Sequence, residues 1–145
     1  MFGEKKITYK NLNLKIHPKY HWIELLMDDQ NFWDEKGFVT SISVMLEFAL
    51  FSRPDYIIVN RINFNGKVSP ILFQFIKKRI LHPLAAEGIR KLICLVDEQV
   101  FLDYYKDIET TEPFLKGFIS REDAIRWITE DQKRHKYTQQ KNSPE

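Results

Sequence analysis

The segment G-F-I-S-R-E-D-A-I-R-W-I, at residues 117–128, gives the clearest indication of the fold of this 145-residue chain. Strand-type apolar residues lead into Ser120, whose hydroxyl can accept a hydrogen bond from a free N–H group of a helix's first turn. Asp123 follows three residues later, where a carboxylate favours the positive start of the helix. The next apolar residues share one helical face, and we expect them to pack on a sheet: Ala124, Trp127 and Ile128. The segment is therefore predicted to be the final strand-to-helix step of an α/β domain.

Two almost wholly apolar segments precede this one, Y-I-I-V-N at 56–60 and K-L-I-C-L-V at 91–96. Uniformly apolar strands are typical of central strands that helices cover on both faces. An amphipathic segment at 38–52 precedes the first, and a helix predicted from Ser69 toward Ala86 separates the two. Strands separated by helices need crossover connections, which are right-handed and place the strands parallel.

The remaining segments complete one layered domain. Residues 11–17 alternate with a period of two and, with 20–27, predict an N-terminal hairpin. Gly88 is predicted to end the long helix, and Pro83 to kink or break it near Leu81. The last predicted elements are a short helix capped by Asp97, a strand at 113–119 and a helix from Ser120. The prediction is a single α/β domain over 1–132, an N-terminal hairpin followed by alternating strands and helices, with a mainly parallel central sheet flanked by helices. A polar C-terminal tail at 133–145 is expected to be loose.

Composition narrows the classes of function. The net charge is +2, too small to indicate a nucleic-acid partner. Cys94 is the single cysteine, which excludes an internal disulfide and a multi-cysteine zinc site, and its apolar surroundings predict a buried thiol. The sequence has no apolar segment of signal-peptide or membrane-span type, so we expect a cytoplasmic protein without membrane insertion.

The chain carries no recognisable catalytic motif. There is no phosphate-cradling glycine loop and no G-x-S-x-G nucleophile turn. His17 and His21 flank a turn, but no third ligand at a suitable spacing completes a metal site. Glu24 and the acidic pair Asp28-Asp29 lie where a strand runs into a polar loop, and we expect them to be solvated rather than catalytic. The prediction is a non-enzyme with no cofactor and no metal.

Two segments resemble small bacterial SpoIIAA-like proteins, also described as STAS-like. The resemblance rests on G-I-R-K-L-I-C-L-V after the long helix, and on F-I-S-R-E-D-A-I-R-W-I, similar to "F-x-S-x-E-E-A-x-x-W-L". It extends over about 11–128 of the chain. The resemblance implies a regulatory or protein-interaction domain similar to anti-sigma-factor antagonists, with an unidentified protein partner; a homo-oligomer is possible.

The resemblance also implies a control point. In the antagonists a serine at the start of the second helix is phosphorylated, and Ser69 occupies that place, although K-V-S-P-I stands here where the antagonists resemble D-S-S-G-L. A phosphate on Ser69 would meet free helix N–H groups and Lys67. The alternative is that Ser69 is only a helix cap. Asn60, Arg61 and Asp97 follow the two central strands, where a ligand or partner would contact an open α/β sheet.

A second function remains open. A related fold group, the Sec14-like domains, encloses apolar ligands, so a small apolar-ligand or lipid-binding module is the alternative to a regulatory domain. Its support is the large number of aromatic residues, 14% of the chain. The candidate apolar-ligand residues near the first helix are Phe32, Trp33 and Phe38.

Overall fold

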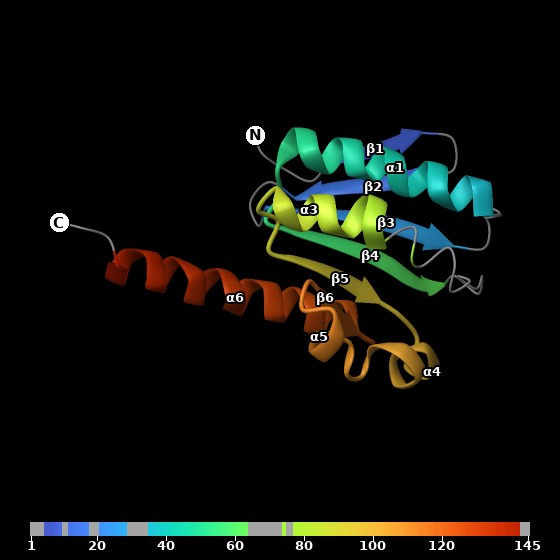
Figure 1. Ribbon diagram of the computed structural model, residues 1–145. Helices are drawn as coiled ribbons and strands as arrows, with labels where there is room; N and C mark the ends of the chain where they lie inside the picture. The colour runs from blue at the N-terminus through green and yellow to red at the C-terminus, as the bar shows by residue number, and fades with distance from the viewer. Residues whose placement is uncertain are drawn as a thin grey trace.

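The chain folds into one six-stranded sheet with helices on both faces (Figure 1). The computed structural model describes the backbone of residues 5–9, 12–17, 21–28, 35–63, 74 and 77–142, and the side chains of 14–17, 21–26, 40, 42–62, 74 and 77–135. The spatial order of the strands is their order in the sequence. The strands are β1 (Lys5–Tyr9), β2 (Leu12–His17), β3 (Trp22–Asp28), β4 (Tyr56–Asn63), β5 (Lys91–Leu95) and β6 (Leu115–Phe118).

The sheet is mixed. β1 pairs with β2 and β2 with β3 in antiparallel register, whereas the β3–β4, β4–β5 and β5–β6 pairs are parallel. The α/β class and the hairpin of β2 and β3 are confirmed, but the sheet is less uniformly parallel than predicted because β1 adds a second antiparallel pair. Only Ile7 and Tyr9 are large apolar residues in β1, too weak a pattern to predict a strand.

The helices that connect the parallel strands pack on one face, here called the α1 face. α1 (Glu35–Ser52) lies between β3 and β4, and η2 (Lys77–Leu81) with α3 (His82–Ala86) precedes β5. Residues from these helices and from the connection before β6 share one buried cluster. That connection contains α4 (Glu98–Val100), η3 (Phe101–Tyr105) and α5 (Ile108–Thr111). Because every step moves to the next strand in the same direction, the parallel strands contain no reversal of strand order.

The opposite face, here called the α6 face, is covered among the described helices by α6 (Arg121–Asn142) alone. Ala124 and Ile128 of α6 are both 0% exposed. They pack against buried side chains of β3, β4 and β5: Trp22, Tyr56, Ile58, Ile93 and Leu95. Trp127 is half-buried at the rim of this cluster, in edge contact with Tyr56 at 6.2 Å between ring centroids. The predicted packing of the last helix on the sheet is confirmed.

Local signals at the helix ends are largely confirmed. Asp97 caps α4, its Oδ1 accepting from the Val100 amide at 2.8 Å, and the Ser120 hydroxyl accepts from the Asp123 amide at 3.3 Å. Gly88 has a φ of 91°, the left-handed conformation expected after a helix end. The long helix changes from π-helical η2 to α-helical α3 at Leu81, where Pro83 predicted a break.

The predicted loose tail is wrong for most of its length, because α6 continues to Asn142. The prediction relied on the polarity of residues 133–145. A polar composition excludes a buried segment but not a helix, since lysine, arginine and glutamine are good helix formers.

Arg53 ends α1 in a left-handed conformation, with a φ of 48°. Its amide donates to the Ala49 carbonyl at 2.8 Å, so it occupies the position after a helix where glycine is favoured. Its ion pair with Glu87 spans 4.0 Å between exposed side chains and contributes little to the stability of the fold.

We therefore expect Arg53→Gly to stabilise the fold by about 1 kcal/mol, because glycine adopts this conformation without a Cβ penalty. Urea unfolding of both proteins measures the change. Arg126→Gly, at an exposed position inside α6, is the control and should instead destabilise by about 1 kcal/mol. Destabilisation by Arg53→Gly would show that the conformation carries no strain.

Candidate functional site

The carboxyl ends of β4 and β5 hold three of the predicted site residues, but the structure does not bring them together. Asn60 and Arg61 are successive residues of β4, so their side chains leave opposite faces of the sheet. Asp97 follows β5 and caps α4. A crevice at such ends forms where strand order reverses, and this sheet has no reversal among its parallel strands.

Asn60 belongs to a buried polar cluster on the α6 face. Its Nδ2 donates to Oε2 of Glu24 at 3.2 Å. Arg121, in the first turn of α6, donates to the same carboxylate through Nε at 3.1 Å and through a terminal nitrogen at 2.8 Å. The three residues come from β3, β4 and α6, so the cluster fixes the start of α6 on the sheet.

Glu24 was predicted to be solvated, and this is wrong: the residue is 2% exposed. Burial by itself raises the pKa of a carboxyl group, but the hydrogen bonds from Arg121 and Asn60 and the positive charge of Arg121 outweigh it, and the pKa of Glu24 lies below its usual value. The carboxylate is therefore ionised at neutral pH and held in an internal ion pair. Sequence position alone could not reveal this, because Arg121 lies 97 residues away.

Arg61 lies on the α1 face with Tyr105 and Cys94. Tyr105 packs against the buried cluster that contains Cys94, and burial raises the pKa of the Cys94 thiol. The prediction of a buried cysteine is confirmed. Gly117 of β6 makes room for this arrangement, since a Cβ at that position would lie 2.6 Å from the Cβ of Tyr105. With its pKa raised, the thiol is protonated at neutral pH, the form that does not act as a nucleophile.

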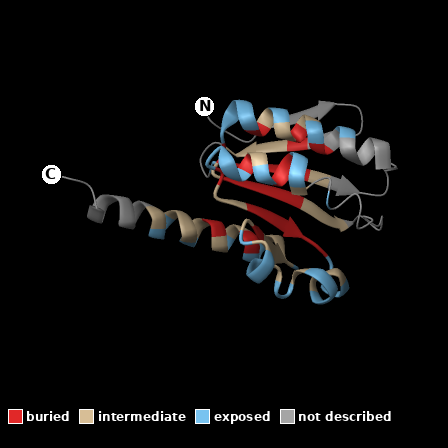
Figure 2. Cartoon of the chain, viewed as in Figure 1, coloured by how far each residue is buried: buried red, intermediate tan, exposed pale blue. Residues whose placement is uncertain are grey.

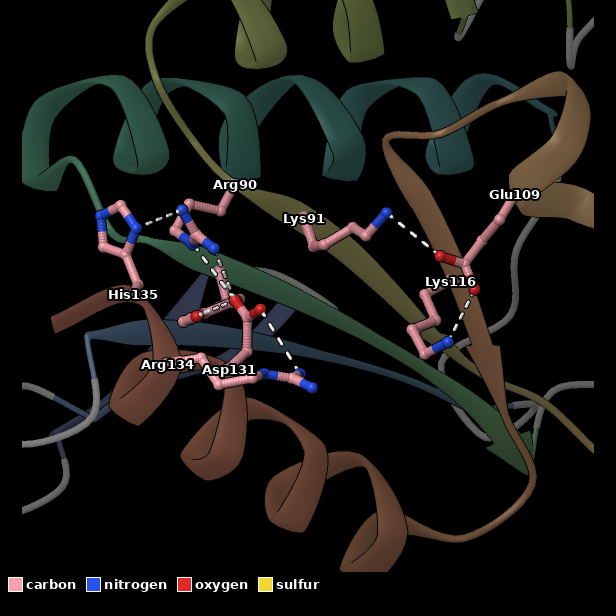
Figure 3. A network of polar contacts seen from close by, with 8 residues as sticks. Arg90, Lys91, Glu109, Lys116, Asp131, Arg134 and His135 are labelled. Carbon is pink, nitrogen blue, oxygen red and sulfur yellow. Dashed lines mark hydrogen bonds and ion pairs between the residues drawn. The ribbon is translucent and has the colours of Figure 1, made fainter. Parts of the chain in front are cut away.

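A second polar network lies at the amino ends of β4 and β5 (Figure 3). The Tyr56 hydroxyl donates to Oδ2 of Asp131 at 2.5 Å, and Arg90 donates to the same oxygen from Nε at 3.1 Å and from a terminal nitrogen at 3.0 Å. Another terminal nitrogen of Arg90 lies 2.8 Å from Nδ1 of His135. Burial opposes ionisation of Asp131, but the hydrogen bonds from Tyr56 and Arg90 lower its pKa. This network holds the middle of α6, and sequence analysis missed it.

Exposed apolar side chains gather at the carboxyl ends of β5 and β6. Leu102 and Tyr104 of η3 are 52% and 71% exposed, and Ile119 after β6 is 50% exposed. The Val96 amide donates to the Phe118 carbonyl at 3.0 Å, so the segments starting at Asp97 and Ile119 leave the sheet side by side. The segments of α4 and η3 are largely exposed in Figure 2.

Exposed carboxylates lie on the same connection after β5 and in the first turn of α6. The surface formed by these carboxylates and the exposed apolar side chains is here called the acidic–apolar end. Its exposed apolar members are Leu102, Tyr104 and Ile119, and its exposed acidic members are Asp97, Glu98, Asp103, Glu122 and Asp123. Sequence analysis placed only Asp97 in a candidate site, since apolar residues in a predicted short helix are ordinarily assigned to the core.

Several predicted site residues lie outside the part of the chain that the structure describes. Ser69 and Lys67 fall in the segment 64–73, and Phe32 and Trp33 in the segment 29–34. Phe38 lies in α1, but its side chain is also outside the described set. The hypotheses of a phosphorylated Ser69 and of an apolar-ligand site both stay predictions.

Two general features of the described residues bear on function. They contain no group of three or more histidine, cysteine, aspartate or glutamate side chains placed to hold a metal ion. Within the same part of the chain, no helix has the length and apolar character needed to cross a membrane. Comparison of the chain with protein-family models, with curated proteins and with solved structures gives no match.

Proposed function

We propose that the chain is a non-catalytic regulatory or protein-interaction domain that binds its partner through the acidic–apolar end. The observation that carries the proposal is the exposure of Leu102, Tyr104 and Ile119 at neighbouring strand ends. Interface cores are enriched in tyrosine and other aromatic residues, and a polar rim surrounds them. The sequence resemblance to STAS-like regulatory domains supports the same class of function.

The polar groups inside the fold favour binding over catalysis. Hydrogen bonds lower the pKa values of both carboxyl groups: those from Arg121 and Asn60 act on Glu24, and those from Tyr56 and Arg90 act on Asp131. A general acid or base at neutral pH needs a pKa shifted toward 7, which is the opposite direction for a carboxyl group. These carboxylates therefore act as anchors for α6 in this proposal.

Ser69 remains the proposed point of regulation. The support is the resemblance to antagonists that are phosphorylated at the corresponding serine, together with the Ser-Pro sequence, which is typical of a helix start. A phosphate would add close to two negative charges after β4 and change the charge that a partner meets.

Partner capture tests the proposed surface. Tagged wild-type protein and the variants Tyr104→Ser and Leu102→Ser are incubated with an extract of the source cells, and bound proteins are identified by mass spectrometry. Because hot-spot truncations at an interface remove 2 kcal/mol or more, we expect the recovery of a specific partner to fall about 30-fold in each variant.

Phe51→Ser is the matched control, because Phe51 is 91% exposed on α1 and lies outside the acidic–apolar end. Ser69→Ala and Ser69→Asp, with phosphosite analysis of the native protein, test regulation separately. Equal recovery of every partner by wild type, Tyr104→Ser and Leu102→Ser would overturn the proposed surface.

A further inference from the structure

The C-terminal part of α6 extends beyond the sheet. α6 has 22 residues and is therefore about 33 Å long, whereas β6, which precedes it, has four. The helix starts at the carboxyl ends of the strands and runs past their amino ends (Figure 1). His135 makes the last described contact with the sheet, to Arg90 at the start of the β5 segment. Residues 133–142, here called the α6 arm, thus form the end of a helix that continues past its own domain.

The α6 arm and the acidic–apolar end carry opposite charges. The sequence of the arm, K-R-H-K-Y-T-Q-Q-K-N, contains lysine and arginine at four positions and neither aspartate nor glutamate. Lys133 and Arg134 are exposed. The acidic–apolar end has five exposed carboxylates, defined above. Two arginines of α6 lie nearby: Arg121 forms an ion pair with Glu24, and Arg126 forms one with Asp123. Lys106, an exposed cation of the same connection, offsets only one of these charges, so the net charge of the acidic–apolar end is negative.

The chemistry of the two surfaces also matches beyond charge. Lysine and arginine carry long apolar stems that can cover exposed leucine and tyrosine while their charged heads reach neighbouring carboxylates. A cation over the ring of Tyr104 would add a cation–π contact. A basic helix therefore fits a surface on which Leu102 and Tyr104 stand among Glu98 and Asp103.

We propose that the α6 arm of one copy of this chain docks on the acidic–apolar end of a second copy. The proposal rests on the function proposed above and names the partner of that surface. The two surfaces lie at opposite ends of the strands, so the arm cannot reach the acidic–apolar end of its own copy (Figure 1). Two copies can exchange arms in a closed dimer, or successive copies can form an open chain.

A charge-reversal pair tests the docking. The end-reversed protein carries Glu98→Lys and Asp103→Lys, and the arm-reversed protein carries Lys133→Glu and Lys136→Glu. Either change alone brings the net charge of one of the two surfaces to about zero and removes the charge attraction between copies, so we expect each reversed protein to be monomeric. An equimolar mixture restores one wild-type contact, between the basic arm of the end-reversed protein and the acidic–apolar end of the arm-reversed protein, so the mixture is expected to form one-to-one dimers. Sedimentation velocity over a concentration series measures association, and thermal melts confirm that each variant folds.

Salt and a control variant separate docking from general charge effects. Association of the wild type should weaken at least tenfold in about 1 M NaCl, where the Debye length falls to about 3 Å. Lys78→Glu with Arg79→Glu, at exposed positions of η2, changes the net charge as the arm reversal does and should leave association unchanged.

The outcomes distinguish this proposal from the proposed function. A monomeric wild type, or reversed proteins that associate as the wild type does, or a mixture that stays monomeric, would each overturn the docking of copies. If the wild type is monomeric but Tyr104-dependent capture of another protein persists, the acidic–apolar end serves a foreign partner and only the docking of copies is wrong. If neither association nor capture occurs, both proposals fall.

Discussion

Replacement of Arg121 by alanine is expected to destabilise the fold by about 3 kcal/mol at neutral pH, because it leaves the buried carboxylate of Glu24 without its counter-charge. Glu24 is 2% exposed, and Arg121 donates to both of its oxygens. Asn60 remains as a donor, and truncation of a partly exposed arginine admits water, so the effect should lie at the lower end of the range for broken buried pairs. Urea unfolding measures it.

The effect of Arg121→Ala should depend on pH in a defined direction. In the wild type the pKa of Glu24 lies below its usual value of 4.5, so the ion pair's contribution is present above that value and lost as pH falls through the folded pKa. In the variant, burial is no longer opposed by Arg121, and the pKa of Glu24 should rise above that of the unfolded chain. The penalty of the buried charge then disappears as the carboxyl group is protonated. The difference between the two proteins should therefore begin to narrow above pH 4.5, as the variant's carboxyl group is protonated, and narrow further as pH falls through the lowered pKa of the wild type.

Arg126→Ala is the matched control, since Arg126 lies on the same helix in an exposed pair with Asp123 at 3.3 Å. Surface pairs of this kind contribute little, and we expect a change within about 0.5 kcal/mol with no comparable pH dependence. Equal effects of the two substitutions would mean that the Glu24 ion pair does not hold α6 on the sheet.

The parts of the fold that sequence predicts well depend on neighbouring residues. The Ser120 and Asp97 caps, Gly88 after a helix and β5, which is apolar after Lys91, each follow from a few adjacent side chains. Their physical causes are local as well: a free N–H group needs an acceptor, and a strand between two helix layers needs apolar side chains on both faces.

The polar clusters could not be predicted because their partners are distant in the sequence. Glu24 and Arg121 are 97 residues apart, and Tyr56 and Asp131 are 75 apart. Glu24 lies in W-I-E-L-L, where its strand position could have suggested a buried carboxylate facing the same side as Trp22. The chain gives no local sign of which cation would pair with it.

In the candidate site too, neighbouring residues predict some features, whereas contacts between distant parts of the chain decide the others. Asp97 was correctly placed after a parallel strand, but the exposure of Leu102 and Tyr104 depends on how η3 lies against β6, a contact that Gly117 permits. Apolar residues in a short helix give the same pattern whether they face the core or solvent. Only the packing of Phe101 and Tyr105 against the α1-face cluster shows which side of η3 is buried.

Ile128→Ala is expected to destabilise the fold by about 3 kcal/mol, as much as Arg121→Ala, but through a different cause. Ile128 is 0% exposed and packs among Tyr56, Ile58 and Ile93. Removing its branched side chain loses apolar burial and leaves a cavity that the rigid central strands cannot easily fill. The smaller change Ile128→Val should cost only about 1 kcal/mol, so the two variants form a graded series.

Ile119→Ala serves as the control for the same substitution at a position that is 50% exposed, and its free energy of unfolding should change by less than about 0.5 kcal/mol. Because α6 is the described helix that covers this face, local detachment of α6 in Ile128→Ala would expose Ile58, Ile93 and Leu95 before global unfolding. Detachment would lower the urea m-value, which scales with the surface exposed on unfolding, whereas a simple cavity leaves the m-value unchanged. An effect of Ile128→Ala no larger than that of Ile119→Ala would show that α6 does not pack on β4 and β5 in solution.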